Sequence, residues 1–370
     1  MPHQSATPQP AVGDLAQRLT AVDDPRDERG IRHEIGTVLV IALCALLCGS
    51  RSLRAIGQWA ANTPQHTRTR LGCRITDPEL GLRTAPSTST IRRVLLACTP
   101  AGVAALARPD STAVLALDGE TLRGSATAQQ AATHVLAALA PGGRIAAQVP
   151  VAGKTSEIAA VEDLLGPLDI DGTVVTADAL HTQTSTARYL AEQRGADYIL
   201  TVKRNQPSLF EQVTRLPWAQ APTGDTDRHR AHGRAETRTV KALSIEVLGF
   251  PHAVQAVRIR RHVTDLRTGE VSWTCAYAVT SLPAERAGAA RLGGLVRGHW
   301  AIEALHHVRD STFAEDACKV RTGHGPANLA ALRSLAALLL SALKRPTIPD
   351  AIRWVSYACF THPLDLIGLA

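Results

Sequence analysis

The stretch "AVLALDGET" (residues 113–121) decides how the chain is interpreted, because an apolar run ends abruptly on Asp118 and Gly119. A short apolar run that stops at turn-forming residues is typical of a buried strand. The acid that ends such a strand is either a turn residue or a carboxylate presented for chemistry. Taken alone, an Asp before Gly more often marks a turn, so the choice depends on the rest of the sequence.

Apolar strands and amphipathic helices alternate after residue 111 in the order β-β-β-α-β-α-β. Three early strands followed by this alternation predict a mixed α/β sheet covered by helices. The segments are, in order, "AVLALD" (113–118), "THVLAALA" (133–140), "RIAAQVPV" (144–151), "SEIAAVEDLLGPL" (156–168), "GTVVTAD" (172–178), "TSTARYLAEQRG" (184–195) and "DYILTV" (197–202).

The regions on either side of this alternation have different sequence patterns, which divide the chain into domains. Residues before 111 predict small helices, and the last of these follows Pro86 and carries Arg92 and Arg93. That helix is either a DNA-groove helix, as in a helix-turn-helix, or an ordinary packing helix. We expect a helical N-terminal domain at 1–110, which binds DNA if that helix enters a groove, a first core part at 111–209, a β-rich insertion at 210–288, completion of the core at 289–345 and a C-terminal tail at 346–370.

Composition limits the classes of protein that the chain can belong to. A net charge of +7 and a pI near 9.3 favour an anionic partner, mildly, because only five of the 40 cationic residues are Lys. The seven Cys never form a CxxC pair, which argues against a zinc ribbon or disulfide framework and favours a reducing cytoplasm. The N-terminus lacks the features of a secretion signal. The longest apolar run, Val38–Cys48, is too short for a membrane span.

Three acids suggest a metal-dependent site. Asp178 ends the fourth strand, and in a three-strand meander the first and fourth strands can be neighbours, which would bring Asp178 beside Asp118. Two adjacent carboxylates repel each other, and a hard cation such as Mg²⁺ compensates. Glu303, in the helix "RGHWAIEALHHVRD" (297–310), would complete a two-metal site for phosphodiester chemistry. The order strand, strand, late helix matches an RNase H-like nucleotidyl-transfer core.

The same helix offers a rival interpretation as a transition-metal site. His299, Glu303 and His307 recur at i, i+4, and Glu303 with His306 forms an ExxH pair. Carboxylate-bridged di-metal bundles need a second ExxH, and the sequence contains neither that nor an HExxH motif. We therefore favour the three-acid interpretation.

Several ordered motifs resemble the ISAs-type insertion-sequence transposases, which are related to the H-repeat-associated proteins of the DDE superfamily. An N-terminal segment, residues 23–49, is similar to the helical domain associated with that group. The motifs are "LALDGETLRGS" (115–125), "KTSEI" (154–158), "VTADALHTQ" (175–183), "YILTVKRNQPSL" (198–209), "HGRAETR" (232–238) and "VRGHWAIEALHHVRDSTFAEDACKVRTGHGPANLAALRSLA" (296–336).

The resemblance implies an RNase H-like domain that cleaves and transfers DNA strands with Mg²⁺, for which Mn²⁺ can substitute. It implies Asp118, Asp178 and Glu303 as the catalytic, metal-binding acids, with His181 and Gln183 in support. It also implies double-stranded DNA as partner, at terminal inverted repeats and target sites, a homodimer on paired ends, and cytoplasmic access to the nucleoid. The implied DNA-binding residues are Arg123, Lys203, Asn205, Gln206, Arg297, His299, Trp300 and Arg321.

Some positions depart from the pattern of related transposases, and other functions stay open. Val296, His299 and Asp310 stand where related chains carry Arg or Tyr before the helix Glu and Lys after it, and Ala304 replaces an Asn. The alternatives are an inactive DNA-binding relative and a metal-dependent nuclease without strand transfer. Glu120 is expected to be a bystander on the face of the strand opposite Asp118.

Overall fold

The computed structural model describes residues 15–153, 156–231 and 233–369, and they form two compact units. The first unit comprises Met1–Asp110, Gly119–Lys154 and Glu303–Ala370, and the second comprises Ser111–Asp118 and Thr155–Ile302. Strand β3 (Val114–Leu122) and helix α10 (Ala289–Ser311) contribute residues to both. The first ten residues, in which no secretion signal was found, and Lys154 of the "KTSEI" motif lie outside the described residues.

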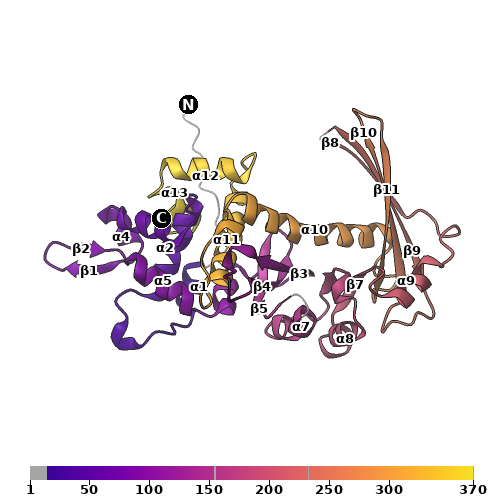
Figure 1. Ribbon diagram of the computed structural model, residues 1–370, viewed down its shortest axis with the longest axis horizontal. Helices are drawn as coiled ribbons and strands as arrows, with labels where there is room; N and C mark the ends of the chain where they lie inside the picture. Colours follow the sequence, from indigo (N-terminus) through magenta and orange to yellow (C-terminus); the bar gives the residue numbers. More distant parts are fainter. Residues whose placement is uncertain (1–14, 154–155, 232, 370) are drawn as a thin grey trace. The chain divides into compact units, whose positions relative to one another are not determined.

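The first unit is built around two apolar helices, α2 (Ile35–Leu47) and α11 (Gly325–Ala342), which pack together (Figure 1). Every residue of α2 except Gly36 is buried, as expected for a helix that is apolar on all sides. The other elements of this unit are α1 (Leu15–Thr20), η1 (Glu28–Gly30), α3 (Leu53–Ala61), α4 (Gln65–Arg70), β1 (Arg74–Asp77), β2 (Leu82–Thr84), α5 (Thr88–Ala97), α6 (Pro100–Ala104), η2 (Ala105–Ala107), η3 (Arg123–Ser125), β4 (Thr133–Ala140), β5 (Arg144–Val151), η7 (Glu315–Ala317), α12 (Ile348–Tyr357) and α13 (His362–Leu366).

The predicted C-terminal tail contains two helices, α12 and α13. Thr347 caps α12 by accepting a hydrogen bond from the Asp350 amide, and Ala351 and Val355 are buried. Neither helix was predicted. The β1–β2 hairpin was also missed, because most of its residues are exposed and no apolar run marks its strands. The predicted domain bounds stay predictions.

Apolar length alone gives weak evidence about membranes. Among the described residues, α11 is the single helix long and apolar enough to cross one, and 89% of that stretch is buried inside the protein. Thr88–Ala97 with Pro100–Ala107 passes the same test only as a pair bent by 102°. A buried core helix meets these criteria as readily as a membrane span does.

Helices α3 and α5 cross closely at Gly57. A Cβ added at Gly57 would overlap the Thr88 side chain and would lie 2.7 Å from the Thr88 Cβ. Such a separation is well inside van der Waals contact, so either the helices or the Thr88 side chain would have to move. Gly57 therefore sets how near the first turn of α5 lies to α3.

We predict that Gly57→Ala destabilises the protein by about 1–3 kcal/mol through overpacking, although Ala is the better helix former. Thermal and urea unfolding measure the change. Gly294→Ala in α10 is the matched control, because an added Cβ there meets no described atom within 4 Å, and it should leave stability equal or higher. A Gly57→Ala protein as stable as the control would contradict the close crossing.

The second unit is a mixed sheet. Its strand order is β3-β6-β7-β11-β10-β9-β8, in which β3, β6 and β7 are parallel and the later pairings are antiparallel. The predicted adjacency of the first and fourth strands is confirmed by the β3–β6 pairing. The elements are β6 (Val174–Ala177), β7 (Asp197–Val202), β8 (Asp225–Ala231), β9 (Arg234–Ser244), β10 (Gln255–Asp265), β11 (Val271–Thr280), α7 (Glu157–Leu165), η5 (Ala179–His181), α8 (Thr184–Arg188), η6 (Tyr189–Gln193) and α9 (Pro207–Thr214).

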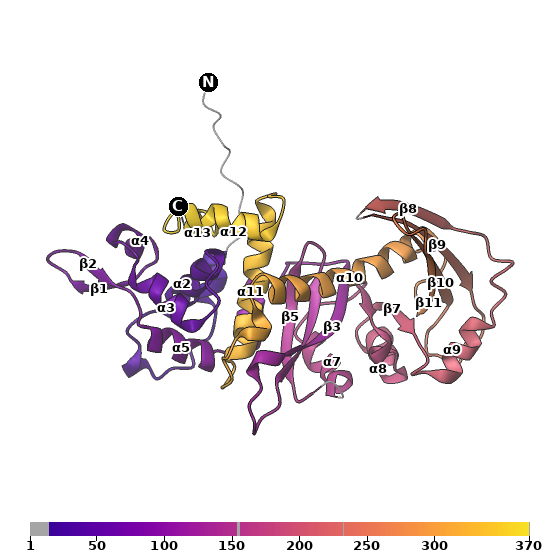
Figure 2. The ribbon, with the colours of Figure 1, turned by 45° about the horizontal axis from the view of Figure 1, so that its top comes forward.

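The first half of α10 covers one face of this sheet. Leu292, with Leu295 and Val296 beside it, packs into a core that includes Val174 of β6 and Ile199 of β7. Helices α7 and α8 lie on the other side of these strands, and strands β8–β11 run side by side beyond β7 (Figures 1 and 2). The strands predicted in 235–280 and the turn at Asp265–Glu270 are confirmed, whereas β8 was missed.

A buried ion network lies in the first unit, and it corrects the expectation for Glu120. Two residues along a strand return a side chain to the same face, so Glu120 does not lie on the face opposite Asp118. It accepts a hydrogen bond from the fully buried Arg309. Arg309 Nε also donates to Glu315 Oε2 (2.8 Å), and Arg333 Nη1 donates to Glu315 Oε1 (3.0 Å). Glu120 is therefore part of the packing of α10, not a bystander.

The pKa values of the two acids in this network are shifted in opposite directions. Burial raises the pKa of Glu120 more than the neighbouring Arg309 lowers it. Burial also acts to raise the pKa of Glu315, but Arg309 and Arg333 together outweigh it, so the Glu315 pKa is lowered. A lowered folded-state pKa contributes stability above the unfolded value, about 4.3, and that contribution is lost as the pH falls through the folded value.

We predict that Glu315→Gln costs about 3–5 kcal/mol of unfolding free energy at pH 7, because two buried arginines lose their counter-charge. The cost should shrink as the pH falls below the unfolded-state pKa of about 4.3 and on through the lowered pKa of folded Glu315. Urea unfolding at pH 7 and at about pH 3 measures both values. Glu211→Gln, which breaks an exposed pair with Arg215, should cost at most about 1 kcal/mol. Equal costs for the two variants at pH 7 would contradict the network's role.

Candidate active site

Asp118 and Asp178 end up side by side on neighbouring parallel strands. Leu117 of β3 is the register partner of Ala177 of β6, so the two acids follow paired residues. Neighbouring strands lie about 4.8 Å apart, so the backbone positions that carry the two carboxylates are neighbours. Both side chains are partly buried. The carboxyl ends of parallel strands are where α/β sheets present their functional groups.

The pair belongs to the sheet face that α10 covers. Val174 packs against this helix, and Thr176 Oγ1 lies 3.1 Å from His299 Nδ1, with both side chains buried. Because side chains alternate along a strand, Asp178 falls on the same face as Thr176. The β3–β6 register places Asp118 on that face as well. Within the second unit, the two acids and His299 thus share one side of the sheet.

Glu303 follows His299 by one helical turn. Residues four apart lie on one face of a helix, so Glu303 continues the face by which His299 contacts the sheet. Its side chain is exposed, and it is the first residue of α10 that belongs to the first unit. Within the described ranges, no group of three or more His, Cys, Asp or Glu is close enough to hold a metal ion. The two Asp are oxygen donors of the kind that Mg²⁺ prefers.

The segment after Asp178 is fixed from several directions. Asp178 Oδ1 accepts a hydrogen bond from the Leu180 amide (2.8 Å), which orients the carboxylate. His181 is fully buried, and its Nε2 lies 3.1 Å from Oε2 of the buried Glu157. A buried ring cannot contact DNA, so His181 supports the loop from within. The role of Glu157 was missed, although it lies in the "KTSEI" motif, because sequence gives no sign of its burial.

The loop after β7 lies at the same sheet end, as predicted, because β6 and β7 are parallel. Asn205 Nδ2 donates to the Ala179 carbonyl (2.7 Å), and Gln206 Nε2 donates to Gln183 Oε1 (3.1 Å). Gln183 Nε2 in turn donates to the Leu180 carbonyl (3.0 Å). These amides brace the segment that carries Asp178, while the side chain of Lys203 is exposed.

The remaining predicted DNA-binding residues lie at the surface of one unit or the other. In the second unit, Arg297 pairs with Asp227 (2.5 Å), and half-exposed Trp300 lies under the guanidinium of Arg238. The partners Asp227 and Arg238 were not foreseen, since they come from strands β8 and β9. In the first unit, exposed Arg123 pairs with Asp316 (3.3 Å), not with Asp118. Also in this unit, Arg321 lies beside Arg92 and Lys319 in a shallow depression.

The family described as "Transposase DDE domain" matches residues 109–340, and the family described as "DDE_Tnp_1-associated" matches residues 16–107. This chain belongs to the DDE transposase family. Membership supports a DNA-processing enzyme, with DNA as its substrate and divalent metal in general use. The resemblance read from the sequence motifs is thereby confirmed.

The chain is also similar to individual proteins. The "H repeat-associated putative transposase YhhI" of Escherichia coli (strain K12) is 27% identical over 355 residues, covering 88% of this chain and 90% of that protein. The "Uncharacterized protein in dhlA 3'region" of Xanthobacter autotrophicus is 33% identical over 235 residues, covering 59% and 77%. Among solved structures, the piggyBac transposase synaptic complex with hairpin DNA has a TM-score of 0.39 at 10% identity, covering 96% and 76%.

We predict that Thr176→Val loosens α10 over the sheet of this DDE transposase. The change keeps side-chain shape and removes the buried partner of His299, which should cost about 1–3 kcal/mol. Urea unfolding gives the free energy, and amide hydrogen exchange in α10 should rise. Thr239→Val in β9 is the matched control, since the Thr239 hydroxyl has no recorded hydrogen bond within the described residues. Exchange in α10 that matches the control would refute the role of this contact.

Proposed function

We propose that the chain cleaves and joins DNA strands at the ends of an insertion sequence, in a Mg²⁺-dependent reaction that Mn²⁺ also supports. Asp118, Asp178 and Glu303 serve as the metal-binding acids of an RNase H-like core, in which β8–β11 form the insertion. The observation that carries the proposal is the β3–β6 register, which pairs Leu117 with Ala177 and so places Asp118, within β3, next to Asp178, directly after β6.

The assignment of Glu303 as the third metal-binding acid rests on the placement of α10. His299 fixes this helix to Thr176, two residues before Asp178 on the same strand. Glu303 lies one turn further on the same helix face, and its exposed carboxylate is available to a ligand. Sequence order, strand then strand then helix, supports the same assignment. His306 and His307, which would favour a transition metal, have no second ExxH partner in the sequence.

A divalent cation would balance the negative charge of the Asp118 and Asp178 carboxylates. The Leu180 amide keeps the Asp178 carboxylate oriented, and carboxylate oxygens are the ligands that Mg²⁺ prefers. A bound pair of divalent ions would activate water or a 3′-hydroxyl and stabilise the leaving oxygen of the phosphodiester. The protein's own part is to fix the acids on rigid strands, so that little reorganisation is needed.

Contacts with the DNA ends would come from the rim of this sheet face. Exposed Lys203 supplies a cation at the strand ends, and Trp300 offers an exposed ring for stacking on a base. Arg297 would exchange Asp227 for a phosphate. We further propose that a homodimer binds two terminal inverted repeats and the target DNA, at the nucleoid in the cytoplasm.

Asp118→Asn should abolish metal-dependent cleavage while duplex binding is kept. Loss of a direct ligand should lower the rate by more than the roughly 10–100-fold that follows from losing an outer-shell partner. Gel assays of terminal-repeat DNA with Mg²⁺ or Mn²⁺ measure cleavage, and fluorescence anisotropy measures binding. Asp163→Asn, an exposed acid of α7 in the same unit, is the matched control. If Asp118→Asn cleaves DNA at the rate of this control, Asp118 is not a metal-binding catalytic acid.

The same assays separate the two alternatives. A nuclease without strand transfer releases cut DNA but never produces joined strands, even with excess target. An inactive relative binds the repeats and nicks nothing with any divalent metal. Joined products that require both Asp118 and Asp178 identify a transposase.

A further inference from the structure

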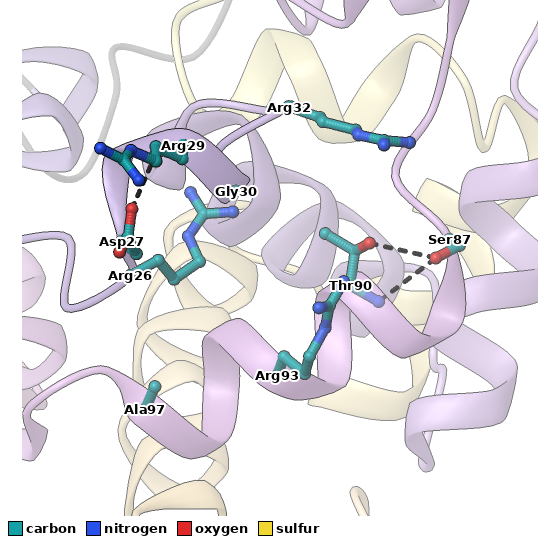
Figure 3. A pocket seen from close by; sticks show the side chains of 9 residues that line it. All are labelled: Arg26, Asp27, Arg29, Gly30, Arg32, Ser87, Thr90, Arg93 and Ala97. Atoms are coloured by element: carbon teal, nitrogen blue, oxygen red, sulfur yellow. Dashed lines mark hydrogen bonds between the residues drawn. The ribbon is translucent and has the colours of Figure 1, made fainter.

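Helix α5 of the first unit lies between two depressions lined by basic side chains. One depression, with a volume of about 790 Å³, is bounded by Arg29 and Arg32 on one side and by Arg93, Thr90 and Ser87 of the α5 region on the other (Figure 3). The whole site lies within the first unit. It is separate from the acids on β3 and β6.

Two of the acids near this depression, Asp24 and Asp27, are already engaged. Asp24 holds Arg26 through two hydrogen bonds of 2.8 and 2.5 Å, and Asp27 caps η1 by accepting from the Arg29 amide (2.9 Å). Arg29, Arg32 and Arg93 are exposed, and in the described part of the chain no carboxylate lies within ion-pair distance of them. The depression therefore carries uncompensated positive charge.

The start of α5 adds donors to the arginines. Ser87 caps the helix by accepting from the Thr90 amide, and its Oγ lies 3.1 Å from Thr90 Oγ1 and 2.9 Å from Ser89 Oγ. Hydroxyls and first-turn amides at a helix N-terminus favour phosphate oxygens. Here they open onto the same depression as three guanidinium groups (Figure 3).

A second basic depression, of about 370 Å³, borders α5 on another side. It is lined by Arg92, Arg54, Lys319 and Arg321, together with hydroxyls such as that of Thr322. Arg92 and Arg93 are consecutive, so they project about 100° apart around the helix, one toward each depression. The charges thus continue from one side of α5 to the other.

Helix α5 is also held rigidly at its far end. Buried Asn328 of α11 donates from Nδ2 to the carbonyls of Leu95 and Cys98, each at 2.9 Å. The His324 amide donates to the Leu96 carbonyl (3.0 Å). These bonds satisfy the last carbonyls of the helix and fix its direction, so the basic side chains stand on a preorganised element.

We propose that α5 and its two depressions form the surface by which the first unit binds the phosphate backbone of double-stranded DNA. Seven cations around a helix about 15 Å long exceed what one small anion needs, and they suit a duplex that carries a charge every 1.7 Å or so. The inference rests on the proposed function and adds to it a DNA contact made by the first unit. We name the seven residues the α5 surface; they are Arg29, Arg32, Arg54, Arg92, Arg93, Lys319 and Arg321.

The test is duplex binding as a function of salt. A labelled duplex of about 30 base pairs is titrated with the full chain by fluorescence anisotropy, without divalent metal. Each phosphate contact contributes about 0.9 to the slope of log K against log salt. The double variant Arg92→Gln with Arg93→Gln should lower the slope by up to about 1.8 and weaken binding at least about tenfold near 0.1 M salt. Circular dichroism confirms folding.

A charge-matched control separates this surface from net charge. Lys344→Gln with Arg353→Gln removes two cations near α12, outside both depressions, and should leave the slope close to that of the wild type. Equal losses in the two double variants, or no loss in the α5 variant, would overturn the inference.

Failure of this inference can be told from failure of the proposed function. If the wild-type chain cleaves terminal-repeat DNA and the α5 substitutions leave binding unchanged, the proposed function is supported and the role of the α5 surface is contradicted. If DNA binding depends on α5 but the chain cleaves DNA with no divalent metal, the role of the α5 surface is supported and the proposed function is contradicted.

Discussion

The parallel pairing of β3 with β6 is the constraint on which the account depends. It joins segments about 60 residues apart in sequence, and its register sets Asp118 beside Asp178. Apolar residues on both strands make the pairing favourable, since Leu115, Leu117 and Val175 are almost wholly buried. Both acids follow paired residues of these strands, and carboxylate oxygens are the ligands that Mg²⁺ prefers.

Helix α10 adds the second element of the site. Its apolar residues pack on the sheet of the second unit, and His299 makes a buried polar contact with Thr176. A buried hydrogen bond of this kind fixes helix rotation more sharply than apolar packing does, because a small turn leaves both partners unsatisfied. The rotation it sets determines the direction in which Glu303, one turn on, presents its carboxylate.

Sequence reasoning predicted the elements that have strong periodicity. Asp118 was expected to end its strand, but β3 continues to Leu122, so Asp118 lies within the strand. The order of strands around Asp118 and Asp178 followed from apolar runs and turn residues. What it missed depends on tertiary partners. The ion pairing of Glu120 with Arg309, the burial of His181 on Glu157 and the brace from Asn205 to Ala179 join residues far apart in sequence. The helices of the C-terminal segment escaped notice because packing, more than local pattern, specifies them.

Metal binding itself, measured apart from catalysis, tests the central claim most directly. Mn²⁺ titrated into the chain with bound duplex, and followed by electron paramagnetic resonance, reports the free ion at each step. The account predicts that Asp178→Asn weakens Mn²⁺ binding by at least about tenfold, because one of two adjacent carboxylates is gone. Mn²⁺ binding by Asp178→Asn that equals the wild-type value would contradict a metal site at the ends of β3 and β6.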